Sequence, residues 1–141
     1  MRFWDSSAIV PLLLDEPGRE AILAMLESDP VMVVWWGTPV ELVSALSRRE
    51  RDGSMTLAAA TSAIERVRAL ERAWHQVVPT DALRGRAQRL LRVHPLRAAD
   101  SLQLAAALSV AGDDPISVSF VSLDQRLADA ARREGLNVWA G

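Results

Sequence analysis

Four acidic residues lie close to the ends of apolar segments along the chain. Asp5 follows the apolar start of the sequence, and Asp124 follows the apolar segment 118–122. Glu41 and Asp100 each lie in the first turn of a predicted helix. Ligands of open α/β sheets bind beyond the carboxyl ends of the strands, so all four carboxylates can converge there. Such a cluster repels itself, and its pKa values rise unless a cation holds it.

The donor types narrow the choice of cation. All four candidate ligands are carboxylates, the sequence has no cysteine, and neither His75 nor His94 is expected near them. Sites made only of oxygen suit Mg²⁺ or Mn²⁺ better than Zn²⁺. These residues therefore predict a site for one or two such ions.

Each acid also has a purely structural explanation. Asp5 and Asp124 can cap helices by accepting hydrogen bonds from free backbone N–H groups. Glu41 can close a capping box that begins at Thr38, and Asp100 can complement a helix dipole. Each role explains one residue, whereas a cation site explains all four together.

Strands and helices are predicted to alternate, with Pro11 in the first turn of its helix and Thr38 as a helix cap. Strands are expected at residues 2–5, 31–36, 75–78, 118–122 and 137–139. Helices are expected at residues 7–14, 19–28, 38–51, 55–74, 80–93, 98–111 and 124–134. This alternation predicts one α/β domain over residues 1–141, with a mostly parallel five-stranded sheet covered on both faces. The segment 38–74 is expected to form a helical arm.

The composition excludes several classes of protein. Half of the 141 residues are hydrophobic and 24% are charged, which is typical of a globular protein. The longest charge-free runs have 12 residues, too short to cross a membrane, and the N-terminus does not resemble a secretory signal. The absence of cysteine fits the cytoplasm. All 16 basic residues are arginine, so the lysine of a P-loop or of a receiver domain is missing.

The charge is unevenly distributed. Residues 51–100 hold 9 Arg against 5 acidic residues, whereas acidic residues predominate on both sides. A basic segment can hold a polyanion, and the candidates for such contacts are Arg86, Arg89, Arg92 and Arg97. The alternative is that these arginines only solvate two long helices.

The acidic residues lie in segments that resemble, in order and spacing, the four motifs of PIN-domain ribonucleases. The segments are Asp5–Val10, Val40–Leu46, Leu96–Ala105 and Phe120–Leu127. The resemblance covers essentially residues 1–141, and compact bacterial members are typically VapC-type toxins of toxin–antitoxin pairs. Trp4 replaces a usual aliphatic residue and Gln103 a common histidine, but neither change removes a ligand.

The resemblance implies a PIN-like three-layer sandwich and a Mg²⁺- or Mn²⁺-dependent endoribonuclease that leaves 5′-phosphate and 3′-hydroxyl ends. Asp5 and Asp100 would be the principal metal ligands, and Glu41 and Asp124 would complete the catalytic set. Further candidates for contact with the RNA substrate are Ser7, Ser122, Arg97, Arg86 and Arg89. The alternatives are a non-catalytic RNA- or protein-binding module on the same fold and a free-standing RNA-processing nuclease.

The resemblance also implies two protein partners, a small cognate antitoxin and a second copy of the chain. The arm carries more apolar residues than the sheet is expected to cover: Leu42, Leu46, Leu57, Ile64, Val67 and Leu70. An apolar antitoxin segment is expected between helix 7–14 and the arm. Trp35 and Trp36 are expected in the core and at a partner contact, with base stacking as the alternative, and His94 is expected to be exposed.

Overall fold

The computed structural model describes residues 1–141 and is built around one sheet of five parallel strands. The strands are β1 (Arg2–Trp4), β2 (Met32–Trp35), β3 (His75–Val77), β4 (Ser119–Val121) and β5 (Asn137–Trp139). Their order is β3-β2-β1-β4-β5, so β1 lies at the centre and every neighbouring pair is parallel. The predicted α/β class is therefore confirmed.

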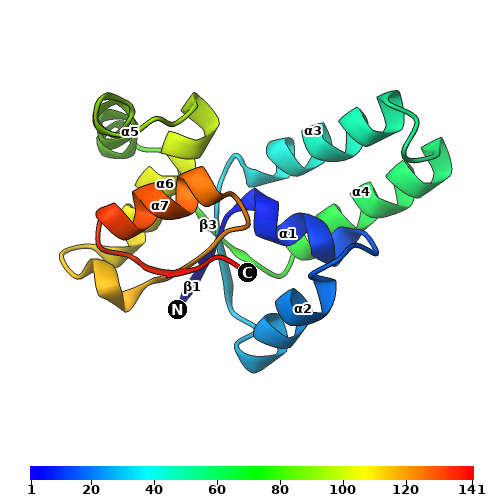
Figure 1. The fold of residues 1–141 in the computed structure, drawn as a ribbon, viewed down its shortest axis with the longest axis horizontal. Helices are drawn as coiled ribbons and strands as arrows, with labels where there is room; N and C mark the ends of the chain where they lie inside the picture. Colours follow the sequence, from blue (N-terminus) through cyan, green and yellow to red (C-terminus); the bar gives the residue numbers. More distant parts are fainter.

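Seven α-helices surround the sheet (Figure 1). They are α1 (Ser6–Leu13), α2 (Arg19–Ser28), α3 (Thr38–Arg51), α4 (Leu57–Glu71), α5 (Asp81–Val93), α6 (Ala98–Ala111) and α7 (Gln125–Arg133). A short 3₁₀ helix, η1 (Pro115–Ser117), precedes β4. No helix is both long enough and apolar enough to span a membrane.

Side chains alternate between the two faces of the sheet and divide the core into two layers. Phe3 and Phe120, on adjacent strands in register, stack with ring centroids 5.7 Å apart and pack with the buried residues of α5, α6 and α7. Trp4, Val34 and Val121 point to the opposite face and pack with α1, α2, α3 and α4. A strand with both faces covered reads as a continuous apolar run, which explains the sequence around β2.

The helix α6 is the most buried helix of the structure, as its nearly continuous apolar sequence predicts. Ala105, Ala106 and Ala107 have no exposed surface. Small side chains let α6 lie close to both α5 and the sheet, and α6 contacts α5 along much of its length. This packing fixes the first turn of α6, which carries Asp100.

The helices α3 and α4 pair side by side and project from the sheet as the arm (Figure 1). Its apolar residues, which exceed what the sheet was expected to cover, are mostly covered by other helices. Leu42, Leu46 and Val67 are buried, Ile64 and Leu70 are partly buried, and only Leu57 is exposed. The reason is that α1 and α2 extend this core layer beyond the sheet.

Three local predictions need correction. Pro11 lies inside α1 rather than in its first turn. Because proline has no N–H, the carbonyl of the preceding turn loses its helical hydrogen bond there. Gly37, not Thr38, precedes α3 as its cap, and Thr38 is the buried first residue of the helix. His94 is buried rather than exposed, with its Nε2 2.8 Å from Glu134 Oε1.

Candidate active site

The structure places all four acidic residues at the carboxyl edge of the sheet. Asp5 directly follows β1, and Glu41 lies in the first turn of α3, the helix after β2. Asp124 follows β4 and precedes α7, and Asp100 lies in the first turn of α6. Strand β1 lies between β2 and β4, so the segments that leave these three strands are neighbours at this edge.

Asp5 is buried and firmly held. Its Oδ2 atom accepts hydrogen bonds from Ser7 Oγ at 2.5 Å, from Ser122 Oγ at 3.0 Å and from the Ser7 backbone N–H at 3.3 Å. The last bond makes Asp5 the N-cap of α1, as its structural explanation requires. Because all these donors reach Oδ2, the other oxygen has only Ser6 Oγ nearby, at 3.5 Å.

The two serines join segments that are far apart in the sequence. Ser7 Oγ accepts a hydrogen bond from the Leu123 backbone N–H at 2.9 Å, and Ser122 Oγ lies 3.3 Å from Ser7 Oγ. Ser122 has no exposed surface. In this structure both hydroxyl groups therefore position the carboxylate of Asp5.

Glu41 is held by a residue whose role the sequence did not indicate. Gln103 Nε2, on α6, donates to Glu41 Oε2 at 2.7 Å and to Thr38 Oγ1 at 3.1 Å, while Ser6 Oγ donates to Glu41 Oε1 at 3.4 Å. The capping box expected between Glu41 and the Thr38 backbone is not formed. Gln103 has no exposed surface, and its Oε1 has no hydrogen-bond partner.

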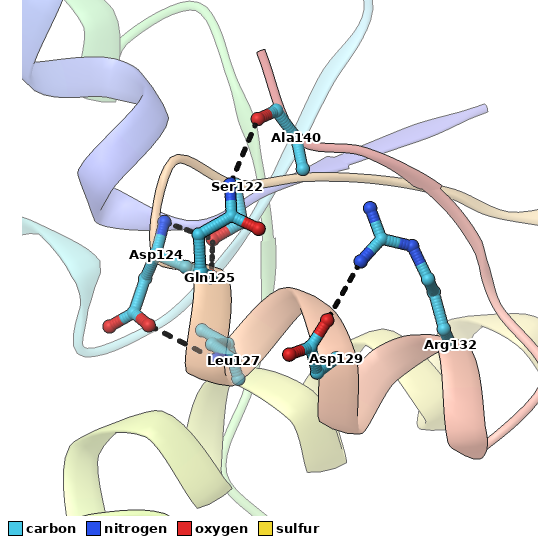
Figure 2. A network of polar contacts seen from close by, with 7 residues as sticks. All are labelled: Ser122, Asp124, Gln125, Leu127, Asp129, Arg132 and Ala140. Carbon is cyan, nitrogen blue, oxygen red and sulfur yellow. Dashed lines mark hydrogen bonds and ion pairs between the residues drawn. The ribbon is translucent and has the colours of Figure 1, made fainter.

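Asp100 and Asp124 line an open cleft of about 660 Å³. Asp124 Oδ1 accepts from the Leu127 N–H at 3.0 Å and so caps α7, while its own N–H donates to Ser122 Oγ at 3.1 Å (Figure 2). The carboxylate of Asp100 accepts a hydrogen bond from the Arg97 backbone and none from a side chain. No side chain therefore competes with a ligand in the cleft for its oxygen atoms.

The carboxylates perturb one another's ionisation. Burial raises the pKa of Asp5, and Asp100 adds to the increase. Burial, together with the charges of Asp5 and Asp100, raises the pKa of Glu41 to about 7. Partial burial and the nearby charge of Asp124 raise the pKa of Asp100. The four residues thus form one connected set of negative charges.

This set fits a divalent cation by its donor chemistry. The donors are all carboxylate oxygens, and Asp5 and Glu41 each keep one oxygen with only a long contact to Ser6. No group of three or more potential ligands is already assembled closely enough to hold a metal. An ion that draws the more exposed Asp100 and Asp124 toward Asp5 would relieve the repulsion that helps to raise the pKa values of Asp5, Glu41 and Asp100.

The arginines fall into two groups. Arg97 and Arg126 line the cleft, and their charges lower the pKa of Asp100 against the effect of burial. Arg126 was missed by sequence reasoning, although its position two residues after Asp124 was a usable signal. Arg89 instead pairs with Glu134 at 3.5 Å, and neither Arg89 nor Arg86 lines this cleft.

Comparisons with known proteins agree with this architecture. The sequence model of the PIN domain family matches residues 2–133, whereas no curated protein sequence matches the chain. Similar solved structures include a toxin–antitoxin complex from Klebsiella pneumoniae, with 13% identity, a TM-score of 0.68 and coverage of 99% of this chain and 97% of that chain. VapC20 from Mycobacterium tuberculosis, a toxin that cleaves the sarcin–ricin loop, has 18% identity, a TM-score of 0.69 and coverage of 92% and 95%.

FitAcB from Neisseria gonorrhoeae has 16% identity, a TM-score of 0.69 and coverage of 99% and 96%. At these identities the structures establish a shared fold, and the sequence model adds the family. The family model covers nearly the whole length of the chain and includes all four acidic segments. The chain belongs to the PIN domain family.

Proposed function

We propose that this protein is a Mg²⁺- or Mn²⁺-dependent endoribonuclease and the toxin of a toxin–antitoxin pair. The observation that carries the proposal is the connected set of four carboxylates beside an arginine-lined cleft, in a chain of the PIN family. Similar folds occur in a toxin–antitoxin complex and in a toxin that cleaves an RNA loop, which supports the biological role.

The four carboxylates would have different parts in binding the metal. Asp5, fixed by Ser7 and Ser122, and Asp100, open to the cleft, would be the principal ligands of the metal. Glu41 and Asp124 would complete the site from α3 and from the start of α7. The bound ion would supply a more acidic water and neutralise charge on the phosphate.

The other side chains of the cleft would bind the substrate. Arg97 and Arg126 present guanidinium groups beside the carboxylates, and guanidinium groups can bind phosphate oxygens through two hydrogen bonds. Arg86 and Arg89 would reach only more distant phosphates.

Because Glu41 has a pKa of about 7 without a cation, metal binding must displace its proton. The apparent affinity for metal should then fall as the pH drops below 7.

The test uses two variants, Asp5→Asn and Asp100→Asn, with Asp113→Asn as a control on an exposed loop. RNA cleavage should fall more than about 100-fold in both variants, because loss of an outer partner of a ligand already costs 10–100-fold in metal sites. Calorimetric titration with Mn²⁺ should show weaker binding in the same variants. Cleavage at the wild-type rate by either variant would refute the assignment. Metal binding by the wild type without cleavage of RNA would favour a non-catalytic binding module.

The proposed partners are a small antitoxin and a second copy of the chain. A groove of about 330 Å³ between α1, α2 and α4 is mostly apolar, with Leu12, Leu23 and Leu70 among its residues, and Arg19 and Arg66 at its polar part. An amphipathic helix with acidic side chains would fit such a groove. It lies where an antitoxin segment was expected, between α1 and the arm.

Trp36 and Val40 are exposed beside the site, by 55% and 73%, and are candidates for the contact with a second copy. Trp35 is in the core, and its ring meets that of Trp36 edge to face. Light scattering should give about twice 15.4 kDa, and coexpression with the neighbouring small reading frame should give an inactive complex in the cytoplasm. A monomer without such a partner would favour a free-standing RNA-processing nuclease.

A further inference from the structure

A second cavity continues the catalytic cleft along α7. It has a volume of about 110 Å³, and its lining includes His94, Asp129 and Arg133. Arg126 lines both this cavity and the cleft that holds Asp100 and Asp124. The two hollows are therefore adjacent, with Arg126 between them.

The spacing of residues on α7 explains why this surface is continuous. Three residues of the lining follow Arg126 by three, four and seven positions, so they lie on the same face of the helix as Arg126: Asp129, Ala130 and Arg133. Ala130 is buried and forms the floor between the longer side chains. Arg126 and Arg133 are two turns apart, about 10 Å along the helix axis.

The charges on this face are unbalanced in favour of the arginines. Asp129 is paired with Arg132 at 3.0 Å (Figure 2). Glu134, next to the cavity, is held by His94 at 2.8 Å and by Arg89 at 3.5 Å. Arg126 and Arg133 are exposed, and neither forms an ion pair. The carboxylates near the cavity are thus paired with other side chains, whereas Arg126 and Arg133 have no ion-pair partner.

We propose that Arg126 and Arg133 form a phosphate-binding track that holds the RNA strand on one side of the cleavage site. The proposal rests on the proposed ribonuclease function and specifies where its substrate lies. Arg97 and Arg126 contact the phosphates at the cleft, and Arg133 contacts a phosphate farther along the strand. The second cavity is lined by no Trp, Tyr or Phe, and its one aromatic ring, that of His94, is buried and bonded to Glu134. The track therefore binds the RNA backbone whatever the base sequence.

The experiment compares Arg126→Ala and Arg133→Ala with Arg72→Ala. Arg72 is an exposed arginine at the end of α4 that forms no ion pair, so its removal costs the same charge away from the cleft. Binding of a fluorescent single-stranded RNA is measured in EDTA over a range of salt concentrations. Each track variant should weaken binding several-fold and lower the salt slope by about 0.7, the value for one phosphate contact on a single strand. Arg72→Ala should match the wild type.

Cleavage in Mg²⁺ separates this proposal from the function on which it rests. The Arg133→Ala variant should raise KM and leave kcat unchanged, because Arg133 does not line the cleft that holds Asp100 and Asp124. If the wild type cleaves RNA but the Arg126→Ala, Arg133→Ala double variant keeps the wild-type slope and KM, the track is refuted and the nuclease stands. If the wild type binds RNA with a slope that depends on both arginines but never cleaves it, the track stands and the nuclease is refuted.

Discussion

Replacing Glu41 with glutamine should stabilise the metal-free protein at alkaline pH. The pKa of Glu41 is raised from its ordinary value of 4.5 to about 7, first because the carboxyl group is buried and then because Asp5 and Asp100 lie nearby. A shift of one pKa unit corresponds to about 1.4 kcal/mol, so the ionised side chain costs the folded state up to about 3 kcal/mol. Glutamine keeps the shape and the hydrogen bond from Gln103 without the charge.

The sign of the pH dependence follows from the raised pKa. Between pH 4.5 and about 7 the folded protein holds a proton on Glu41 that the unfolded chain has already lost. The wild type is therefore stabilised below this range, and this contribution disappears as the pH rises through about 7. The Glu41→Gln variant should match the wild type near pH 4 and exceed its stability by up to about 3 kcal/mol at pH 8.

The assay is urea unfolding in EDTA at pH 4, 6 and 8, followed by tryptophan fluorescence. Glu27→Gln is the control, since Glu27 is an exposed residue at the end of α2. Saturating Mg²⁺ should reduce the advantage of Glu41→Gln, because the ion stabilises only the folded wild-type site. An equal or lower stability of Glu41→Gln at pH 8, or a gain that does not change with pH, would refute the reasoning.

Two further substitutions test the surroundings of the site. Gln103→Leu should lower stability by about 1–3 kcal/mol and weaken Mn²⁺ binding, since Thr38 and Glu41 lose their common donor; unchanged Mn²⁺ affinity in calorimetry would contradict a role in positioning Glu41. Gly37→Ala should cost about 1–3 kcal/mol and shift the fluorescence of Trp35, because the added Cβ would lie 2.6 Å from Trp35 Nε1. Wild-type stability with an unaltered emission spectrum would show that the ring can move freely.

The sequence predicted the elements well because their patterns are strong and local. The valine-rich run at β2 and the nearly uniform apolar sequence of α6 each indicate one structure. The errors involve groups whose environment is set by distant residues. The hydroxyl of Thr38, which was expected to cap α3, instead accepts a hydrogen bond from Gln103, and the buried His94 bonds to Glu134, 40 residues away.

The site, too, could be predicted where local patterns decide it and not where distant residues do. The convergence of Asp5 and Asp124 could be predicted, because parallel strands end at one edge of a sheet. The support of Glu41 by Gln103 could not, since 62 residues separate them and a glutamine in an apolar helix has no distinctive spacing. The bond from Ser122 to Asp5 spans 117 residues and depends on the pairing of β1 with β4.

The separation of 117 residues between Asp5 and Ser122 has a consequence for the synthesis of the protein. The central strand β1 is made before the other four strands, yet one of its two neighbours, β4, is made only after β2 and β3. Until β4 emerges from the ribosome, Asp5 lacks the hydroxyl group of Ser122, and Asp124 has not yet been added. Pairings between distant segments also form late in folding, because a long loop must close first. A nascent chain therefore cannot assemble this site until β4 and the residues that follow it have been made.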